Sequence, residues 1–479
     1  MRKTTYDAFR LFMKGSEVLT RMESNGIRIH RKRLRRTIKS LGERIQGLEE
    51  KLRETDVAKK WRQVYGNNMK WDARQQLASV LFDHLKYETP SQVTATGKVK
   101  ADRSSLESVD IPFVKEYLLF QELKKVKTTI ASIGKEATDG FLHPSFNLAG
   151  GSGEDQEIGG ARSFRSSSSN PNFQNLFARI PEYARLVRRC FIPRKGRVLV
   201  ENDFGALEFR IAACVWNDPE MISYASDPKK DIHRDTAADC YALPIKEVGK
   251  QVRYCGKNMM VFPIIYGSYY KQCSKNLWEA IDHFDLKTES GVPLKEHLRD
   301  KGIEELGECD PRQDPSPGTF EYHIKEVEER FFRHFSVFAA KKKEWIAAYR
   351  EKARFRMVTG FPVQGLYSNN ALLNYPIQGP GFHCLLWTII RVQEILDERG
   401  METLLIGQIH DCSIGDTPEG EIQEYISIVK KVVSEELPKA FDWIVVPLEI
   451  EAEVTPVGKT WWDKEQWIED KGIWKPKPK

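Results

Sequence analysis

The sequence predicts an α+β protein in which an antiparallel sheet and two mainly helical parts form separate subdomains. Three observations predict this class. Apolar residues recur four and three residues apart from Leu34 to Leu52, as in an amphipathic helix. Residues 197–202 (RVLVEN) are typical of a strand, and residues 404–416 (LLIGQIHDCSIGD) of a strand, a tight turn and a second strand. The length of 479 residues with 41% apolar residues suffices for two or three subdomains.

The composition narrows the class of protein. Lysine and arginine number 74 against 68 aspartates and glutamates, a mild basic excess that is compatible with a nucleic-acid partner but does not establish one. Eight cysteines stand singly without a CxxC pair, which argues against a disulfide framework and a structural zinc site. Neither a signal-peptide core nor a run of roughly 18 apolar residues is present. We therefore expect a cytoplasmic protein without a membrane segment.

The first 140 residues are expected to be mainly helical. Asn25-Gly26 predicts a tight turn, after which the stripe from Leu34 to Leu52 predicts one long helix. Residues 117–133 predict a second helix. Three basic residues of this second helix form either a solvated surface or a patch that binds DNA: Lys124, Lys125 and Lys127.

The rest of the chain alternates loops, strands and helices. Residues 149–170 are rich in Gly and Ser and predict a loop outside the core. The strand at 197–202 is followed by a helix through residue 216, and helices dominate 233–354 apart from a polar stretch at 309–318 with three prolines. The last six residues, WKPKPK, are expected to fray.

Two acids are placed as metal-binding carboxylates are placed. Asp203 ends the strand of residues 197–202, and Asp411 stands in the turn of the 404–416 hairpin. Two magnesium ions roughly 3.5–4 Å apart can lower the pKa of an attacking hydroxyl and neutralise a leaving pyrophosphate, and they need hard oxygen ligands. Taken singly, an Asp at a strand end is more often a cap or turn residue, so spacing alone does not pair the two.

The segment RYCGKNMMVFPIIYG, residues 253–267, adds the opposite charge. Arg253 and Lys257 are four residues apart and could bind a triphosphate from one helix face. Phe262 and Tyr266, also four apart, could offer an aromatic face to a base or sugar. Taken alone, the pattern fits equally an amphipathic helix with two surface cations.

The order of these motifs resembles the family A DNA polymerases. DFGALEFR from Asp203, R-x3-K followed by YG from Arg253, and IHDC around Asp411 resemble motifs A, B and C of that family. Further stretches resemble it as well: RSSSSNPNFQN from Arg165, DIHRDTAADCYALP from Asp231, NYPIQG from Asn374, and the closing VPLEIEAEV with Trp461 and Trp462. The segments SNGIRI and ADRSSLESV resemble the family's thumb, so the likeness covers nearly the whole chain.

The resemblance implies a right-hand polymerase with an antiparallel-sheet palm, helical fingers and a helical thumb. The implied boundaries are palm 1–30, thumb 31–140, palm 141–217, fingers 218–350 with an insertion at about 275–322, and palm 351–479. The implied activity is template-directed extension of a primer 3′ end with deoxynucleoside triphosphates and two Mg²⁺ ions. Replication of a phage or viral genome in the host cytoplasm is the expected setting, with a separate exonuclease, helicase or processivity factor as further partners.

Site roles follow from the resemblance position by position. Asp203, Asp411 and the backbone carbonyl of Phe204 are expected to ligate metal. His233, Arg253 and Lys257 would bind the triphosphate, with Lys257 also catalytic. Glu208 would exclude a ribose 2′-hydroxyl, and Phe262 and Tyr266 would contact the incoming sugar and base. Primer and template contacts are expected at Arg165, Asn172, Gln174, Asn175, Asn374, Gln378 and His410, besides the three lysines 124, 125 and 127.

The chain departs from the family pattern in two places. Phe204, Gly205 and Ala206 replace a Tyr, Ser and Gln of motif A, and Cys412 replaces the usual Glu after Asp411. In motif B, Lys257 and Tyr266 are nine residues apart, where the family has eight. One extra residue rotates a helix by about 100°. We therefore predict a π-bulge or kink between Lys257 and Phe262, which would put Phe262 rather than Val261 at the sugar-facing position, as in polymerases that reject dideoxynucleotides.

Alternative functions stay open at this point. A single-subunit RNA polymerase shares the Arg, Lys and Tyr-Gly helix and the His-Asp hairpin, but Glu208 argues against it because RNA synthesis needs room for the 2′-hydroxyl. A degenerate polymerase that binds primer-template only as an accessory factor would explain Cys412. Neither a proofreading nor a 5′-nuclease domain is expected, and the nearby D-x-E at Asp155 to Glu157 is expected to be loop charge.

Overall fold

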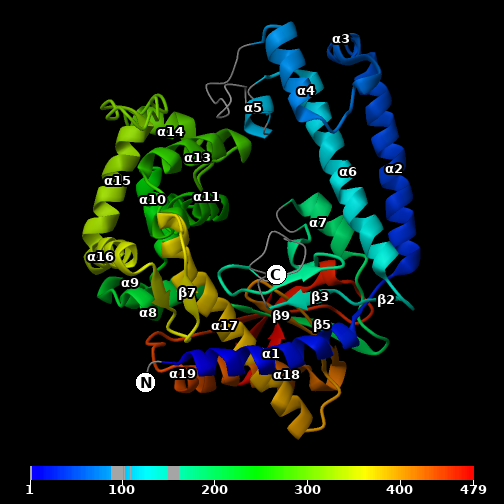
Figure 1. Cartoon of the computed structure of the whole chain (residues 1–479), viewed down its shortest axis with the longest axis vertical. Helices are drawn as coiled ribbons and strands as arrows, with labels where there is room; N and C mark the ends of the chain where they lie inside the picture. Colours follow the sequence, from blue (N-terminus) through cyan, green and yellow to red (C-terminus); the bar gives the residue numbers. More distant parts are fainter. Residues whose placement is uncertain are drawn as a thin grey trace.

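A computed structural model describes residues 3–478 apart from 88–100, 102, 108, 149–160, 178 and 179. A six-stranded antiparallel sheet with helices beneath it forms the base, and two helical arms rise from it, one on each side (Figure 1). The N-terminal arm comprises residues 31–136, and the central arm comprises residues 219–352. This arrangement confirms the predicted α+β class with a sheet and two separate helical parts.

The sheet has the strand order β12-β11-β10-β5-β9-β8, and all neighbouring strands are antiparallel. Asp203 of β5 is paired with Cys412 of β9 on one side and with Glu451 of β10 on the other. The predicted strand and hairpin are both confirmed, with His410 and Asp411 in the turn between β8 and β9. The strands are β5 (Arg197–Phe204), β8 (Leu404–Ile409), β9 (Cys412–Pro418), β10 (Ile450–Val454), β11 (Glu465–Asp470) and β12 (Ile473–Pro476).

Helices cover one face of this sheet and leave the other for Asp203. Gly415 pairs with the fully buried Val200, and a Cβ on Gly415 would lie 2.8 Å from the Tyr425 ring. Because side chains alternate along a strand, Glu201 and Asp203 face away from that helical layer. The helices at the base are α1 (Thr5–Asn25), α8 (Leu207–Trp216), α17 (Asn369–Glu398), α18 (Ile422–Lys431) and α19 (Leu437–Ala440).

The N-terminal arm consists of a long helix pair with a small helical tip. Gly26, with φ of 62°, caps α1 at the predicted turn, and α2 (Arg31–Glu54) and α6 (Pro112–Glu136) then form the predicted pair. Leu34 and Leu52 are buried, as the stripe predicts. The tip contains α3 (Asp56–Tyr65), α4 (Arg74–Ala78), a π-helical turn (Ser79–His84) and α5 (Arg103–Glu107). Short strands β1 (Ile27–Arg28) and β2 (Phe141–Leu142) pair at its base, near α7 (Pro181–Arg188).

Helices dominate the central arm apart from the polar stretch at 309–318, as predicted. A buried ion pair between Lys271 and Glu321 joins the segments that precede and follow the polar stretch. Their side chains are 5% and 2% exposed, and Lys271 Nζ lies 3.4 Å from Glu321 Oε1. Lys271 also donates to the carbonyls of Asp310 and Gln313, which fixes the polar stretch at 309–318 against the arm. The helices are α9 (Pro219–Ser226), α10 (Ile232–Cys240), α11 (Lys250–Cys255), α12 (Phe262–Ile265), α13 (Tyr270–His283), α14 (Leu294–Asp300), α15 (Phe320–His334) and α16 (Ser336–Lys352), followed by the hairpin β6 (Arg354–Arg356) and β7 (Pro362–Gln364).

Two expectations about loops are wrong. The C-terminal tail does not fray before residue 477, because Ile473–Pro476 form β12 and Trp474 is buried with its N–H donating to Gln423 Oε1 at 2.8 Å. Within the serine-rich stretch, β4 (Ser167–Ser169) pairs with β3 (Ser145–Asn147), and Ser168 is buried. Residues 149–160, with Asp155 and Glu157, lie outside the described residues. In the described part of the chain, no helix is long and apolar enough to cross a bilayer.

Candidate active site

Asp203 and Asp411 lie side by side at one end of the sheet. Asp203 is the last residue but one of β5, and Asp411 directly precedes β9. The Phe204 N–H donates to the Asp411 carbonyl at 3.3 Å, and Asp203 is in register with Cys412. Strand pairing thus brings two acids that are far apart in sequence to the same end of two adjacent strands, whose backbones lie about 4.8 Å apart.

The neighbourhood of Asp203 is strongly negative. Although its side chain still reaches solvent, crowding by the protein and, after it, the carboxylates of Asp411, Glu201 and Glu451 together raise the Asp203 pKa to about 7. Burial also raises the pKa of Asp411. The compensating cation is Lys464, whose Nζ lies 2.7 Å from Glu201 Oε1. Such an excess of negative charge is what a bound divalent cation would relieve.

The donors at this end of the sheet fit Mg²⁺. Asp203, Asp411 and the carbonyl of Phe204 offer hard oxygens, and the buried Cys412 thiol stays neutral because burial raises its pKa far above the ordinary value. No group of three or more His, Cys, Asp or Glu side chains that could hold a metal occurs among the described residues. Two carboxylates suit Mg²⁺ bound partly through water and substrate phosphates.

The helix that carries Arg253 and Lys257 contains the predicted extra residue. α11 passes into a π-helical turn (Gly256–Val261) and then into α12, which confirms a bulge between Lys257 and Phe262. The rings of Phe262 and Tyr266 are stacked with centroids 6.1 Å apart, and Lys257 Nζ lies 5.6 Å from the Phe262 centroid. Val261 is fully buried. Side chains before and after the bulge therefore share one face.

Basic side chains gather beside this face. Arg253 Nε donates to Asp231 Oδ2 at 2.6 Å, which fixes its guanidinium. His233 is 3% exposed, and both its ring nitrogens are buried without a hydrogen-bond partner among the described residues. Burial, aided by Lys257 and Arg253, lowers the His233 pKa to about 3, so the ring is neutral. A Cβ at Gly256 would lie 2.8 Å from the His233 carbonyl oxygen, so glycine is what lets α10 approach this closely.

Glu208 lies between the sheet carboxylates and the aromatic face. Burial raises its pKa, as does Asp411, while Arg165, Tyr266 and Lys257 oppose that rise. Arg165 Nη1 is 3.8 Å from Glu208 Oε1. The Tyr266 hydroxyl is buried without a hydrogen bond of normal geometry in the described structure, and burial and the nearby Glu208 raise its pKa. The charge of Lys257 reaches Asp411 as well, so these five residues form one electrostatic cluster.

A polar pocket of about 260 Å³ adjoins this cluster. In it, Gln174 Nε2 donates to Gln408 Oε1 at 2.9 Å and to Ser166 Oγ at 2.8 Å. Asn374, one helical turn before the pocket residue Gln378, has a buried Oδ1 without a partner in the described part. The pocket brings together six of the residues expected to contact DNA: Arg165, Asn172, Gln174, Asn175, Gln378 and His410.

Several residues of this region were missed in the sequence. Gln408 is fully buried and lines the pocket, and its position two residues before His410 on a strand was the available signal, since such residues share a face. The same alternation along a strand was the available signal for Glu201, which is two residues before Asp203 and shares its face. Asp231 and Glu451 gave no local signal, because only the tertiary structure brings them to Arg253 and to Asp203.

The three lysines of α6 are not brought to this site. They lie in the N-terminal arm (Figure 1). Lys124 is paired with Asp72, with Nζ 2.7 Å from Oδ1, and Lys125 lies over the Phe177 ring at 5.8 Å from its centroid. Lys127 is half-buried. Contact of these lysines with DNA stays a prediction.

Comparison with known proteins gives one consistent result. The profile of DNA polymerase family A matches residues 32–283, more than half of the chain. DNA polymerase I of Chloroflexus aurantiacus is 26% identical over 460 residues, which cover 94% of this chain and 42% of that protein. Thermostable DNA polymerase I of Thermus thermophilus is 26% identical over 471 residues, covering 93% and 47%. The chain thus spans less than half the length of these two relatives.

A solved structure shows the same fold. The POL domain of Pol1 from M. smegmatis, in complex with DNA primer-template and dNTP, matches with a TM-score of 0.71 and 22% identity over 94% of this chain and 70% of that one. The sheet and its two helical arms therefore form the right-hand polymerase fold. Because the family profile spans more than half of the sequence, the chain belongs to DNA polymerase family A.

Proposed function

We propose that this chain is a DNA-directed DNA polymerase that extends a primer with deoxynucleoside triphosphates. The observation that carries the proposal is the position of Lys257, whose charge acts on Asp411 and Glu208 of the sheet side and on His233 of the central arm. A site with carboxylates on one side and basic side chains on the other suits a nucleotide whose phosphates lie between metal ions and basic side chains.

Each group has a distinct part in this proposal. Asp203 and Asp411, with the Phe204 carbonyl, would hold two Mg²⁺ ions, which when bound lower the pKa of the primer hydroxyl and neutralise the leaving pyrophosphate. Arg253 and Lys257 would bind the triphosphate as cations. The buried, unpartnered ring of His233 would donate a hydrogen bond to a phosphate oxygen.

Selection of the nucleotide would fall to the face between these groups. Glu208 would exclude a ribose 2′-hydroxyl, while the stacked rings of Phe262 and Tyr266 would contact the sugar and base. The amides of Gln174, Gln378 and Gln408 would face the minor groove, where acceptors common to all base pairs allow shape to be sensed without sequence preference. Lys257 could also donate a proton to the leaving pyrophosphate.

The relatives limit the biological setting. Those named above are bacterial, so the expectation of phage or viral replication draws no support from them. A separate exonuclease, helicase or processivity factor likewise stays a proposal. The proposal is therefore confined to DNA synthesis on a primer-template.

The test is primer extension with and without Mg²⁺, using wild type, Asp411→Asn and the control Asp300→Asn, an exposed acid on α14. Loss of one metal ligand removes several kcal/mol of transition-state stabilisation, so we expect Asp411→Asn to lose on the order of 10³-fold in rate. Wild-type rates in Asp411→Asn would overturn the assignment. Faster incorporation of ribonucleotides by wild type would instead indicate an RNA polymerase, and no extension with any nucleotide would indicate an accessory factor.

A further inference from the structure

A second basic surface lies where the N-terminal arm joins the sheet. It consists of three adjoining hollows of about 550, 430 and 400 Å³. Arg33 lines both the first and the second hollow, and Arg28 and His30 line both the second and the third. The surface is formed by residues 28–33 and 37, α7 with the following Arg189, residues 139–141, residues 192–197 and residues 457–462, and we call it the basic groove.

The basic groove has a much larger excess of basic over acidic residues than the chain as a whole. Ten lysines and arginines line it, against only two acids, Asp139 and Glu182. Glu182 is already paired with Arg44. The chain as a whole has 74 basic and 68 acidic residues, so this excess is local. A local excess of this size attracts a polyanion.

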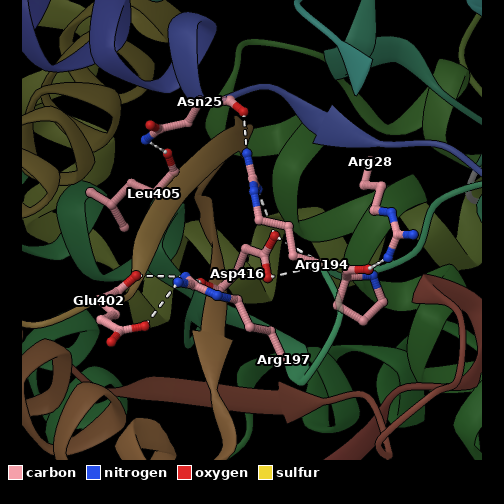
Figure 2. A network of polar contacts seen from close by, with 8 residues as sticks. Asn25, Arg28, Arg194, Arg197, Glu402, Leu405 and Asp416 are labelled. Atoms are coloured by element: carbon pink, nitrogen blue, oxygen red, sulfur yellow. Dashed lines mark hydrogen bonds and ion pairs between the residues drawn. The ribbon is translucent and has the colours of Figure 1, made fainter. Parts of the chain in front are cut away.

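Part of this charge is used within the fold. Figure 2 shows Arg194 directed at Asp416, with Nη1 2.6 Å from Oδ2, and Arg197 directed at Glu402, with Nη2 3.2 Å from Oε2. Arg194 also donates to the backbone carbonyl of Asn25. These contacts tie the groove to the sheet and the end of α1, and they give it a rigid floor.

The remaining cations are free to bind a ligand. Those that are exposed and make no ion pair within the described residues are Arg31, Lys32, Arg185, Lys195 and Lys459. Beneath them, the buried Nε of Arg189 has no hydrogen-bond partner in the described structure. Burial lowers the His30 pKa, and the neighbouring Arg33, Arg36 and Arg28 lower it further, as a positive potential requires.

The groove is separate from the site at Asp203. β5 begins at Arg197, which lines the groove, and reaches Asp203 six residues later. At about 3.3 Å per residue, the two sites are about 20 Å apart, at opposite ends of one strand. A nucleotide bound at Asp203 therefore cannot occupy the groove.

We propose that the basic groove binds a single-stranded segment of nucleic acid outside the site at Asp203 and Asp411. Phosphates spaced along one strand suit cations spread over three hollows, and unpaired bases can enter hollows that a rigid duplex would only span. The half-buried Trp462 lines the largest hollow, where a base can stack on it. An acidic peptide could use the cations but has no comparable use for an aromatic ring in the same hollow.

The test uses Arg31→Ala/Lys32→Ala/Lys195→Ala and a control that loses the same charge at exposed positions elsewhere, Lys301→Ala/Lys431→Ala/Lys439→Ala. The affinity of each protein for a labelled oligothymidine is measured by fluorescence anisotropy over a range of salt concentrations. A saturating unlabelled hairpin primer-template is present throughout, so that the site at Asp203 is occupied. Each phosphate contact to a single strand contributes roughly 0.7 to the slope of log K against log salt. We expect the groove variant to lower that slope by about 2 and to weaken binding at least about tenfold, and the control to match wild type.

Equal affinity and equal slope in the groove variant and the control would overturn the proposal. Preferential loss of binding to duplex DNA or to polyglutamate, rather than to oligothymidine, would also overturn it and identify the other class of ligand. Extension of the short hairpin by the groove variant should stay at the wild-type rate. Loss of polymerase activity in wild type would leave the groove measurement intact, so the two proposals fail separately.

Discussion

Deletion of Asn258 is expected to leave the site active, because the π-helical turn holds one residue more than an α-helix needs. The buried positions along this helix are spaced three, one, four, one, three and one apart, with the single four between Gly256 and Met260. Removing one residue there gives the alternation of three and one that is typical of one continuous buried helix face. The same deletion leaves Arg253, Lys257, Phe262 and Tyr266 each four residues from the next, which is the spacing of one helix face. The buried positions are Val252, Cys255, Gly256, Met260, Val261, Ile264 and Ile265.

Insertion at the same place should have the opposite effect. One further alanine after Asn258 rotates the following helix by about 100° and adds about 1.5 Å of rise. At the 5–6 Å radius of a helix with its side chains, that rotation moves a side chain by about 8 Å. Lys257 would then lose its place relative to Phe262 and Tyr266. Since a displacement of 1 Å can cost about 10²-fold in rate, we expect at least that loss.

Single-turnover primer extension on saturating DNA measures both variants, with thermal melting to confirm that they fold. Asn258→Ala is the matched control, because it keeps the length while removing the hydrogen bond from Asn258 Nδ2 to the Tyr254 carbonyl at 2.9 Å. We expect the deletion and the control to stay within about threefold of wild type, well under 1 kcal/mol in barrier height. A folded deletion variant as slow as the insertion variant would refute the argument from register.

Three further predictions test other parts of the site and fold. Glu208→Ala should lower the preference for deoxynucleotides over ribonucleotides by about 100-fold in kcat/KM, and an unchanged preference would remove the steric role. Gly256→Ala would put a Cβ 2.6 Å from that of Ala237, so α10 must shift; we expect KM for the nucleotide to rise about tenfold, and normal KM at normal stability would contradict this. Burial raises the Glu328 pKa from 4.5 to about 7, so the stability that this group gives below pH 4.5 is lost as pH rises through 7. Glu328→Gln should therefore raise the free energy of unfolding at pH 8.5 by up to about 3 kcal/mol, seen as a higher melting temperature, and have little effect at pH 5. An equal gain in melting temperature at both pH values would refute this account.

Local patterns predicted the central elements of the fold well. The strand before Asp203 and the hairpin around Asp411 could be predicted because short apolar runs bounded by an acid or a turn are typical of strands. The extra residue in the Lys257 helix was visible because helical spacing is rigid, so nine residues in place of eight require a bulge. Both features depend on neighbours in sequence, and both are present in the structure.

Features set by tertiary contacts could not be predicted in the same way. Asp231 precedes α10, and nothing around it indicates that it holds Arg253 through a 2.6 Å hydrogen bond. Gly256 looks like an ordinary helix weakness, yet its missing side chain lets α10 bring His233 to the site. Such roles depend on which helix packs against which, and that information is spread over the whole chain.

Runs of basic residues were a poor guide to basic surfaces. Lys124 and Lys125 are adjacent in sequence but point about 100° apart on a helix, and the first is paired with Asp72. The basic groove instead collects cations from four separated segments, in which residues 31–33 and 194–195 form only short runs. Charge density on a folded surface therefore follows from the packing of α2, α7 and β5, which no single window of sequence contains.

The sheet also explains how the site accommodates Cys412. In the antiparallel pairing, Cys412, Asp203 and Glu451 form one row across three strands, so their side chains share a face. The thiol is neutral, but Glu451 on the other side of Asp203 supplies a carboxylate, and its charge helps to raise the Asp203 pKa. Loss of an acid from β9 therefore leaves Asp203 with anionic neighbours from β10 and from Glu201. Because Lys464 already neutralises part of that charge, an acid at position 412 would add repulsion in a buried place rather than restore a missing charge.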